Sequence, residues 1–215
     1  MRTGWRFLGP AAAVLTMVAC GGGDDAAAQA SAAAAAPQAA ARADGLAEAT
    51  FAGGCFWCME PPFDALEGVK ETISGYTGGR TTNPTYDEVS KGGTGHAEVV
   101  RIVYDPAVVT YETLVEVFWK NVDPFAVNRQ FCDAGDQYRS AIFYHDSAQR
   151  RIAEETKRAH EQRFRRPVAT QIAPVAAFTR AEEYHQDYYR KNPIRFNFYK
   201  YSCGRARRLE ELWGQ

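Results

Sequence analysis

The chain has 215 residues, of which 46% are hydrophobic and 24% charged, a composition typical of a globular protein with one well-filled core. Its formal net charge of −1 excludes the strongly basic field that draws proteins to nucleic acid or to an anionic membrane surface. We therefore expect a single folded domain that does not bind nucleic acid.

The first segment, residues 1–19, has the organisation of a signal peptide. Arg2 and Arg6 precede an uncharged run at 7–19 that ends in small residues. A membrane-spanning helix needs roughly 20 apolar residues, and this run is shorter and contains both glycine and proline. We therefore predict that residues 1–19 direct export and are then removed.

The end of that segment resembles the bacterial lipobox, in which the signal is cut before a cysteine that becomes lipid-modified. The residues are Met17-Val18-Ala19-Cys20-Gly21, and Met17 stands where the usual leucine would be. We predict a membrane-anchored lipoprotein, periplasmic or on the cell surface, with its lipid on Cys20. The alternative is a cleaved secretory signal followed by an incidental cysteine.

Residues 20–45 predict a flexible tether. They contain no aromatic and no branched aliphatic side chain, so nothing in them offsets the entropy of ordering the backbone. A lipid followed by such a spacer would hold a domain near a membrane without embedding it. The folded domain is then expected over residues 46–215.

Within this domain, short runs bounded by glycine or alternating in polarity predict strands. They lie at Ala47–Ala52, Thr72–Tyr76, Glu98–Tyr104, Ser140–Tyr144 and Ala169–Phe178. Apolar residues at three- and four-residue spacing predict amphipathic helices at Tyr111–Asn121 and Ser147–Phe164. Mixed strands and helices indicate an α/β (α+β) fold, with one sheet covered by helices.

Four cysteines fall in this domain: Cys55, Cys58, Cys132 and Cys203. A structural zinc site needs paired ligands at close spacing, and only Cys55 and Cys58 are so paired. We therefore predict no metal. A set of structural disulfides stays open as an alternative, since an exported chain meets oxidising surroundings.

Cys55 is the cysteine whose surroundings indicate reactivity. It follows Gly53-Gly54 at the end of a predicted strand, and the apolar residues after it predict the start of a helix. Free backbone N–H groups and the helix dipole favour a thiolate there and lower its pKa. Phe56 and Trp57 are able to form an apolar wall for a methyl group or thioether, although core packing explains them equally well.

The segment Gly54-Cys55-Phe56-Trp57-Cys58-Met59-Glu60 resembles the signature of the A-type peptide methionine sulfoxide reductases. Further family blocks follow in order: Ser74-Gly75-Tyr76-Thr77-Gly78-Gly79, Asn83-Pro84-Thr85-Tyr86, Gly95-His96-Ala97-Glu98-Val99, Gln137-Tyr138-Arg139-Ser140 and Ala181-Glu182-Glu183-Tyr184-His185-Gln186. The resemblance covers nearly all of the chain from Ala47 onward, and several ordered blocks make a chance match very improbable. It implies a two-layer sandwich with a small central mixed sheet and a ferredoxin-like core.

The same resemblance implies reduction of the S-epimer of methionine sulfoxide, free or in oxidised proteins, to methionine. Cys55 would attack the sulfoxide sulfur, and Phe56 with Trp57 would hold the methyl group. Glu98 would give a proton to the sulfoxide oxygen, since burial among aromatic residues raises a carboxyl pKa.

Three further side chains take roles from the resemblance. Tyr86 and Tyr138 would hydrogen-bond the sulfoxide oxygen, and Asp133 lies where the family has another polar site residue. Without the family blocks, these tyrosines would be read as half-buried packing, and Glu98 as a solvated strand residue. His96 and His185 are expected to be structural.

The attack would leave Cys55 as a sulfenic acid, which a second thiol must convert to a disulfide. Cys203 is the first choice, since the family commonly carries its resolving cysteine in a mobile tail. Cys58 is the second, because a helix start would point its side chain away from Cys55; Cys132 can be structural. A thioredoxin-like donor would restore the thiols, with no cofactor in the polypeptide.

Two alternative functions remain at this point. A general thiol–disulfide oxidoreductase would use Cys55 and Cys58 as a CxxC pair, but the motif lacks the usual small or Gly-Pro interior. A lipoprotein that only binds oxidised methionine would form no methionine even with excess reductant.

Overall fold

The computed structural model describes residues 45–214. The predicted signal peptide, the lipid site Cys20 and all of the predicted tether except Gly45 lie outside these residues. Within residues 45–214, no helix is both long enough and apolar enough to cross a membrane.

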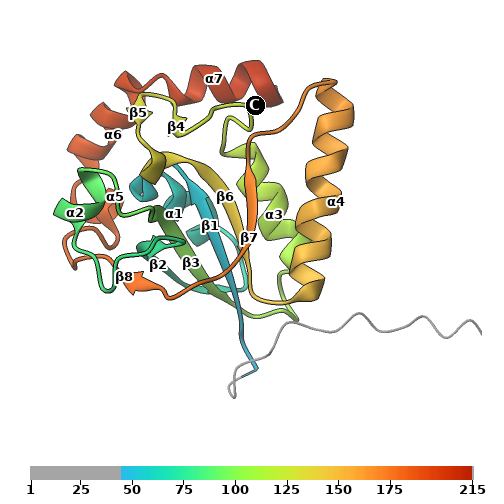
Figure 1. Ribbon diagram of the computed structural model, residues 1–215, viewed down its shortest axis with the longest axis horizontal. Helices are drawn as coiled ribbons and strands as arrows, with labels where there is room; N and C mark the ends of the chain where they lie inside the picture. Colours follow the sequence, from blue (N-terminus) through green and yellow to red (C-terminus); the bar gives the residue numbers. More distant parts are fainter. Residues whose placement is uncertain (1–44, 215) are drawn as a thin grey trace, which may run out of the picture. The chain divides into compact units, whose positions relative to one another are not determined.

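Six strands form one mixed sheet in the order β7-β6-β1-β3-β2-β8 (Figure 1). Neighbouring strands are antiparallel except for β6 and β7, which are parallel. The strands are β1 (Ala47–Gly53), β2 (Val69–Thr77), β3 (Ala97–Tyr104), β6 (Ser140–Tyr144), β7 (Gln171–Pro174) and β8 (Thr179–Arg180). A separate pair consists of β4 (Arg129–Gln130) and β5 (Asp133–Ala134).

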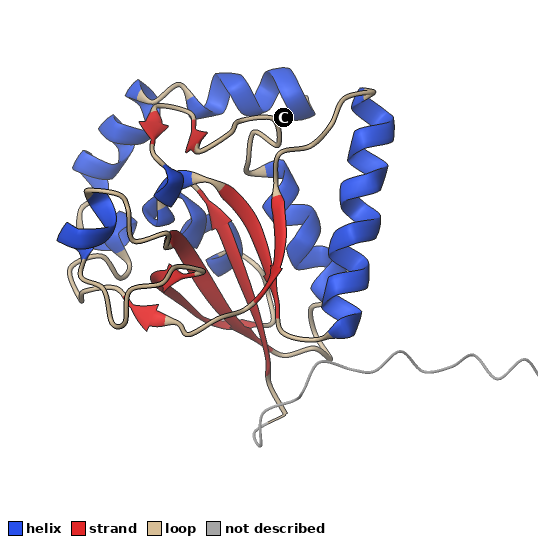
Figure 2. Ribbon diagram, viewed as in Figure 1, coloured by secondary structure: helices blue, strands red, loops and turns tan. Residues whose placement is uncertain are grey.

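Helices connect these strands and form the C-terminal region (Figure 2). They are α1 (Phe56–Asp64), α2 (Tyr86–Ser90), α3 (Tyr111–Lys120), the 3-10 turn η1 (Asp136–Tyr138), α4 (Ser147–Phe164), α5 (Tyr188–Lys191), α6 (Pro193–Ser202) and α7 (Arg205–Trp213). The order β1-α1-β2-β3-α3-β6, with the strands arranged β6-β1-β3-β2, is the split βαβ arrangement of ferredoxin-like folds. The predicted fold class is therefore confirmed.

The two faces of the sheet are covered by different parts of the chain. Phe51 of β1 lies opposite Val100 of β3 and Ile142 of β6, and this row packs against the apolar sides of α1, α3 and α4. The alternate residues, such as Ala52 and Val99, face the other way and pack against the chain that follows β7. Because strand side chains alternate between faces, one face carries the main core and the other a thin cover.

The predicted strands and helices correspond to β1, β2, β3, β6, α3 and α4. The strand predicted over 169–178 is too long, since β7 covers only Gln171–Pro174. Phe178 instead packs on the thin-cover face, where its ring fills the space that a side chain at Gly75 would need. The region after Asp187, which contains Cys203, is helical in α5, α6 and α7.

Candidate active site

Cys55 is the N-cap residue of α1, as the sequence predicts, and its side chain is only 7% exposed. The tight passage from β1 to α1 depends on Gly54, which has φ of +85°. A Cβ at Gly54 would lie 2.6 Å from Cβ of Gln130, so a larger residue would have to displace this buried neighbour. The candidate nucleophile Cys55 therefore lies at the junction of β1 and α1, directly after a position that requires glycine.

The alternation of β3 places Glu98 beneath α1. Glu98 shares the face of Val100 and Ile102, which is the helix-covered face, and lies directly opposite Tyr76 of β2. One of its oxygens accepts a hydrogen bond of 3.2 Å from the backbone N–H of Phe56. Burial raises the pKa of Glu98 to about 8, so the carboxyl keeps its proton near neutral pH.

The thiols of Cys55 and Cys58 share a hydrogen bond, with Cys55 as the donor. The prediction that the helix start would point Cys58 away from Cys55 is therefore wrong, because the first turn is tight and the Cys58 N–H reaches the Cys55 carbonyl at 3.0 Å. Within the described residues, these two cysteines are free thiols.

The proton of this pair resides on Cys55. Burial raises the pKa of Cys55 well above its ordinary value, and the hydrogen bond to Cys58 and the Glu98 charge act in the same direction. The hydrogen bond from Cys55 lowers the pKa of Cys58 to about 7, against its own burial, and Arg205 assists. The expected depression of the Cys55 pKa is thus not found, because desolvation outweighs the helix start.

Phe56 and Trp57 extend from the first turn of α1 into an aromatic cluster. The Trp57 ring stacks on Tyr188, with centroids 3.7 Å apart and planes 7° from parallel. Its indole N–H donates to Nδ1 of His185 at 3.0 Å, and the His185 ring lies 4.9 Å from the Phe56 ring. The two predicted pocket residues are therefore held rigidly beside Cys55.

The predicted oxygen-binding tyrosines come from two short turns. Tyr86 is the first residue of α2, and its N–H donates to Glu182, whose other oxygen accepts from the Tyr76 hydroxyl. Burial and the nearby Glu98 charge raise the pKa of Tyr86 to about 12, and the same causes raise the pKa of Tyr138. Both hydroxyls remain protonated and able to donate.

Asp133 joins the site through Tyr199 of α6, whose hydroxyl donates to its carboxylate. Beside it, Cys132 and Cys203 form a disulfide with their Cα atoms 4.9 Å apart. The two sulfur atoms and an Asp133 oxygen lie within 4.8 Å of one another, which is the one group in residues 45–214 with a metal-ligand spacing. Because the two sulfurs are bonded to each other, this state offers no thiolate to a metal.

Two site residues were missed by the sequence reasoning, Tyr188 and Tyr199, while His185, expected to be structural, supports Trp57. Burial lowers the pKa of His185 to about 4, so it is neutral, and Trp57 occupies its Nδ1 as a donor. The available signal was the dense aromatic run over residues 184–199, which contains six Tyr and Phe side chains. His96, by contrast, is structural as expected, held between the Gly79 N–H and the Thr81 carbonyl.

The model of one family, described as peptide methionine sulfoxide reductase, matches residues 47–215. The chain belongs to this family. The peptide methionine sulfoxide reductase MsrA of Listeria innocua is 52% identical over 172 residues, which cover 79% of this chain and 97% of that protein. The MsrA of Bacillus licheniformis is 50% identical over 169 residues, which cover 78% of this chain and 93% of that protein.

Solved structures of related proteins match the fold of this chain. The reduced form of Mxr1 from Saccharomyces cerevisiae matches with a TM-score of 0.68 and 33% identity, over 71% of this chain and 89% of that one. Methionine sulfoxide reductase A of Corynebacterium diphtheriae matches with a TM-score of 0.64 and 36% identity, over 70% and 76%. The resemblance to the A type is therefore confirmed, together with the sheet and helix arrangement.

Proposed function

We propose that this reductase converts the S-epimer of methionine sulfoxide, free or in oxidised proteins, to methionine by direct attack of Cys55 on sulfur. The observation that carries this proposal is the arrangement of a buried thiol above a protonated buried carboxyl, Glu98, beside a rigid aromatic wall. A sulfoxide presents an apolar methyl group and a basic oxygen on one sulfur atom, and this site offers a surface for each.

Cys58 supports the attack by accepting the proton of Cys55. The two thiols interact directly, and the lowered pKa of Cys58 makes its thiolate available near neutral pH as the proton acceptor. The Cys55 thiolate then forms a bond to the sulfoxide sulfur while Glu98 gives its proton to the oxygen. The oxygen ends on Cys55 as a sulfenic acid, and methionine leaves.

The polar groups around the site hold the oxygen during this step. Tyr86 and Tyr138 donate hydrogen bonds to it as its negative charge develops, which stabilises the transition state more than the ground state. Asp133, held by the Tyr199 hydroxyl, is a further polar group of the site. Phe56 and Trp57 enclose the methyl group.

Cys58 is also the best-placed thiol for the second step. It already contacts Cys55, whereas Cys203 is bonded to Cys132 in this structure. Condensation of the Cys58 thiol with the sulfenic acid releases water and gives a Cys55–Cys58 disulfide. We propose this order in place of direct resolution by Cys203, which the sequence alone favours.

Cys203 then acts as the next thiol in a relay. Cys58 lines a pocket of about 400 Å³ together with Lys200 and Arg205, which lie on either side of Cys203 in the chain. The Cys203 thiolate attacks Cys58, and Cys132 next attacks Cys203, so that Cys55 and Cys58 return to thiols. The product is the Cys132–Cys203 disulfide observed here, which a thioredoxin-like dithiol donor reduces.

These steps balance atoms and electrons with cysteines and an external dithiol alone, so the reaction needs no metal or organic cofactor. The general CxxC oxidoreductase alternative has one supporting observation, the contact between Cys55 and Cys58. That alternative gives no role to Glu98, Tyr86 or Tyr138.

The function is tested with the two separated epimers of a methionine sulfoxide peptide and dithiothreitol as reductant. We expect methionine from the S-epimer only, because the methyl and oxygen positions of the R-epimer exchange their surroundings in the site. Methionine from the R-epimer at a comparable rate would contradict the site assignment. Disulfide exchange with no methionine from either epimer would support the alternative.

The relay is tested by substituting its thiols one at a time. We expect Cys203→Ser to lose turnover with thioredoxin and to stop after one methionine, with a Cys55–Cys58 disulfide found by peptide mass mapping. Cys58→Ser should stop with an oxidised Cys55 and no disulfide to Cys203. If Cys58→Ser instead turns over normally with thioredoxin, Cys203 resolves Cys55 directly.

We further propose that the protein is an exported lipoprotein, anchored by a lipid on Cys20 and a tether over 20–45. The sequence features at 1–19 and at Met17–Gly21 support this proposal. The mass of the N-terminal peptide from the membrane fraction of expressing cells should show cleavage before Cys20 and a diacylglyceryl addition. A free thiol at Cys20, or an uncleaved Met1, would contradict it.

A further inference from the structure

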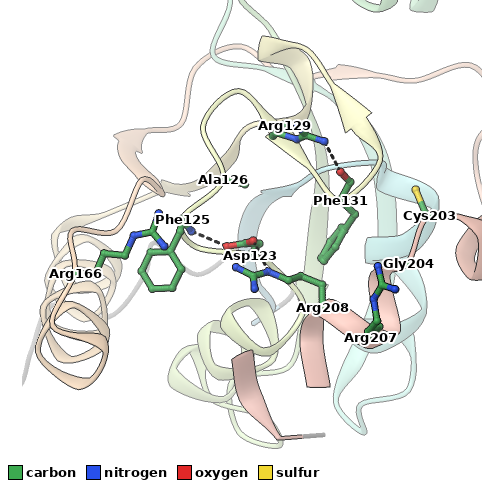
Figure 3. Close-up of a pocket in the computed structure, with 10 residues that line it drawn as sticks. All are labelled: Asp123, Phe125, Ala126, Arg129, Phe131, Arg166, Cys203, Gly204, Arg207 and Arg208. Atoms are coloured by element: carbon green, nitrogen blue, oxygen red, sulfur yellow. Dashed lines mark hydrogen bonds and ion pairs between the residues drawn. The ribbon is translucent and has the colours of Figure 1, made fainter. Parts of the chain in front are cut away.

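A second concavity lies beside the Cys132–Cys203 disulfide (Figure 3). Its volume is about 380 Å³, and Cys203 with its neighbours Gly204 and Arg207 forms one side of it. Arg166 stands at the opposite side, and the Asp123–Arg208 pair lies between them. The size falls within the range of small-molecule sites, roughly 300–1,000 Å³.

The lining of this pocket is strongly basic, with four arginines and a single carboxylate. Arg208 is neutralised by Asp123 at 2.8 Å and by Glu211 at 3.0 Å. The other three arginines, Arg129, Arg166 and Arg207, have no carboxylate partner among residues 45–214. The pocket therefore carries an uncompensated positive charge that favours anionic ligands.

Two of these guanidinium groups are partly held in place by the protein. Arg129 donates to the carbonyl of Phe131 at 2.9 Å, and the guanidinium carbon of Arg166 lies over the Phe125 ring, 4.4 Å from its centroid. Their remaining N–H donors are free for a ligand. A planar guanidinium pairs best with a carboxylate, through two parallel hydrogen bonds.

The disulfide itself is open to solvent, since Cys132 is exposed and Cys203 half-buried. We propose that the pocket binds a small peptide thiol that carries at least two carboxylates, and that this thiol reduces the Cys132–Cys203 disulfide. The proposal rests on the proposed function, in which this disulfide must be reduced in every turnover.

The reduction takes place in two exchange steps. The ligand thiolate attacks Sγ of Cys203, the bond to Cys132 breaks, and Cys132 leaves as a thiolate that takes up a proton. A second thiolate of the same kind then attacks the ligand sulfur of this mixed disulfide and frees Cys203. Two ligand thiols become one ligand disulfide, and two electrons pass to the protein.

The experiment uses the oxidised protein and follows its Cys132–Cys203 disulfide by alkylation and mass spectrometry, with no sulfoxide present. The probes are glutathione, a tripeptide thiol with two carboxylates, and its diethyl ester, compared at equal thiolate concentration. We expect glutathione to react about tenfold faster at low salt, since each exposed ion pair contributes a small factor and several act together. The advantage should shrink as salt rises.

The matched variants are Arg129→Gln with Arg207→Gln, and Arg158→Gln as the control. Arg158 is an exposed arginine of α4 that does not line the pocket. The double variant should lose most of the glutathione advantage, and the control should keep it. Equal rates for the two probes, or an undiminished advantage in the double variant, would overturn the proposal. Methionine formation with dithiothreitol is measured separately, so its loss would count against the proposed function instead.

Discussion

Cys55→Ser is expected to abolish methionine formation with every reductant. The serine hydroxyl stays protonated in this buried position, so the attack on sulfur has no nucleophile. We expect a loss on the order of 10⁴-fold or more, as for other enzymes whose nucleophile is removed. The measurement is single-turnover methionine release, which does not depend on the later thiol exchange.

A second variant, Cys55→Ala, tests the contact between the two thiols. Cys58 loses its hydrogen-bond donor in Cys55→Ala, whereas the serine hydroxyl of Cys55→Ser still donates, and that hydrogen bond is the main cause of the lowered pKa of Cys58. We therefore expect the pH midpoint of Cys58 alkylation to move upward from about 7. Thermal unfolding serves as the control for folding. Methionine release that persists in the folded variant would place the nucleophile elsewhere.

Glu98→Gln is expected to slow the chemical step by roughly 10²- to 10⁴-fold, the usual contribution of a positioned acid. The amide keeps the shape and the contact with the Phe56 N–H but has no proton to give at useful acidity. In the unsubstituted protein, the single-turnover rate should fall as the pH rises through about 8, because Glu98 then loses its proton. The variant should lack that decline.

Stability provides an independent readout of the same group. The pKa of Glu98 is raised from 4.5 to about 8 on folding, so the folded state holds the proton more tightly than the unfolded chain. The free energy of unfolding from this group therefore decreases as the pH rises from 4.5 to 8. Glu98→Gln should remove this dependence, measured by denaturant unfolding at several pH values. An unchanged rate and an unchanged stability profile would exclude Glu98 as the acid.

The sequence predicts the first half of the site well, for a local reason. Cys55, Phe56 and Trp57 follow one another at a strand-to-helix junction, and Glu98 lies in a strand whose alternation is legible from Val100 and Ile102. These features depend on neighbours a few residues away. Secondary structure is therefore enough to place Cys55 at the helix start and Glu98 on a strand. That the two meet came from the family resemblance, because the residues alone would give a solvated Glu98.

The remaining features depend on contacts between distant segments, which periodicity does not encode. The Cys132–Cys203 disulfide joins residues 71 positions apart, and Tyr188 reaches Trp57 from the far end of the domain. The pKa order of Cys55 and Cys58 also escapes the sequence, because it follows from the burial of Cys55 and from the hydrogen bond between the two thiols. Helix-start chemistry predicts the opposite direction for Cys55.

The aromatic and polar groups around α1 have a consequence for the order in which the site is completed during synthesis. Cys55 and Glu98 leave the ribosome early, whereas His185, Tyr188 and Tyr199 belong to the last part of the chain to be made. A chain that lacks this part has neither the Tyr188 ring that stacks on Trp57 nor the Tyr199 hydroxyl that holds Asp133. The C-terminal helices thus complete the site last, and a chain truncated before Tyr184 would contain Cys55 and Glu98 without the ring that stacks on Trp57.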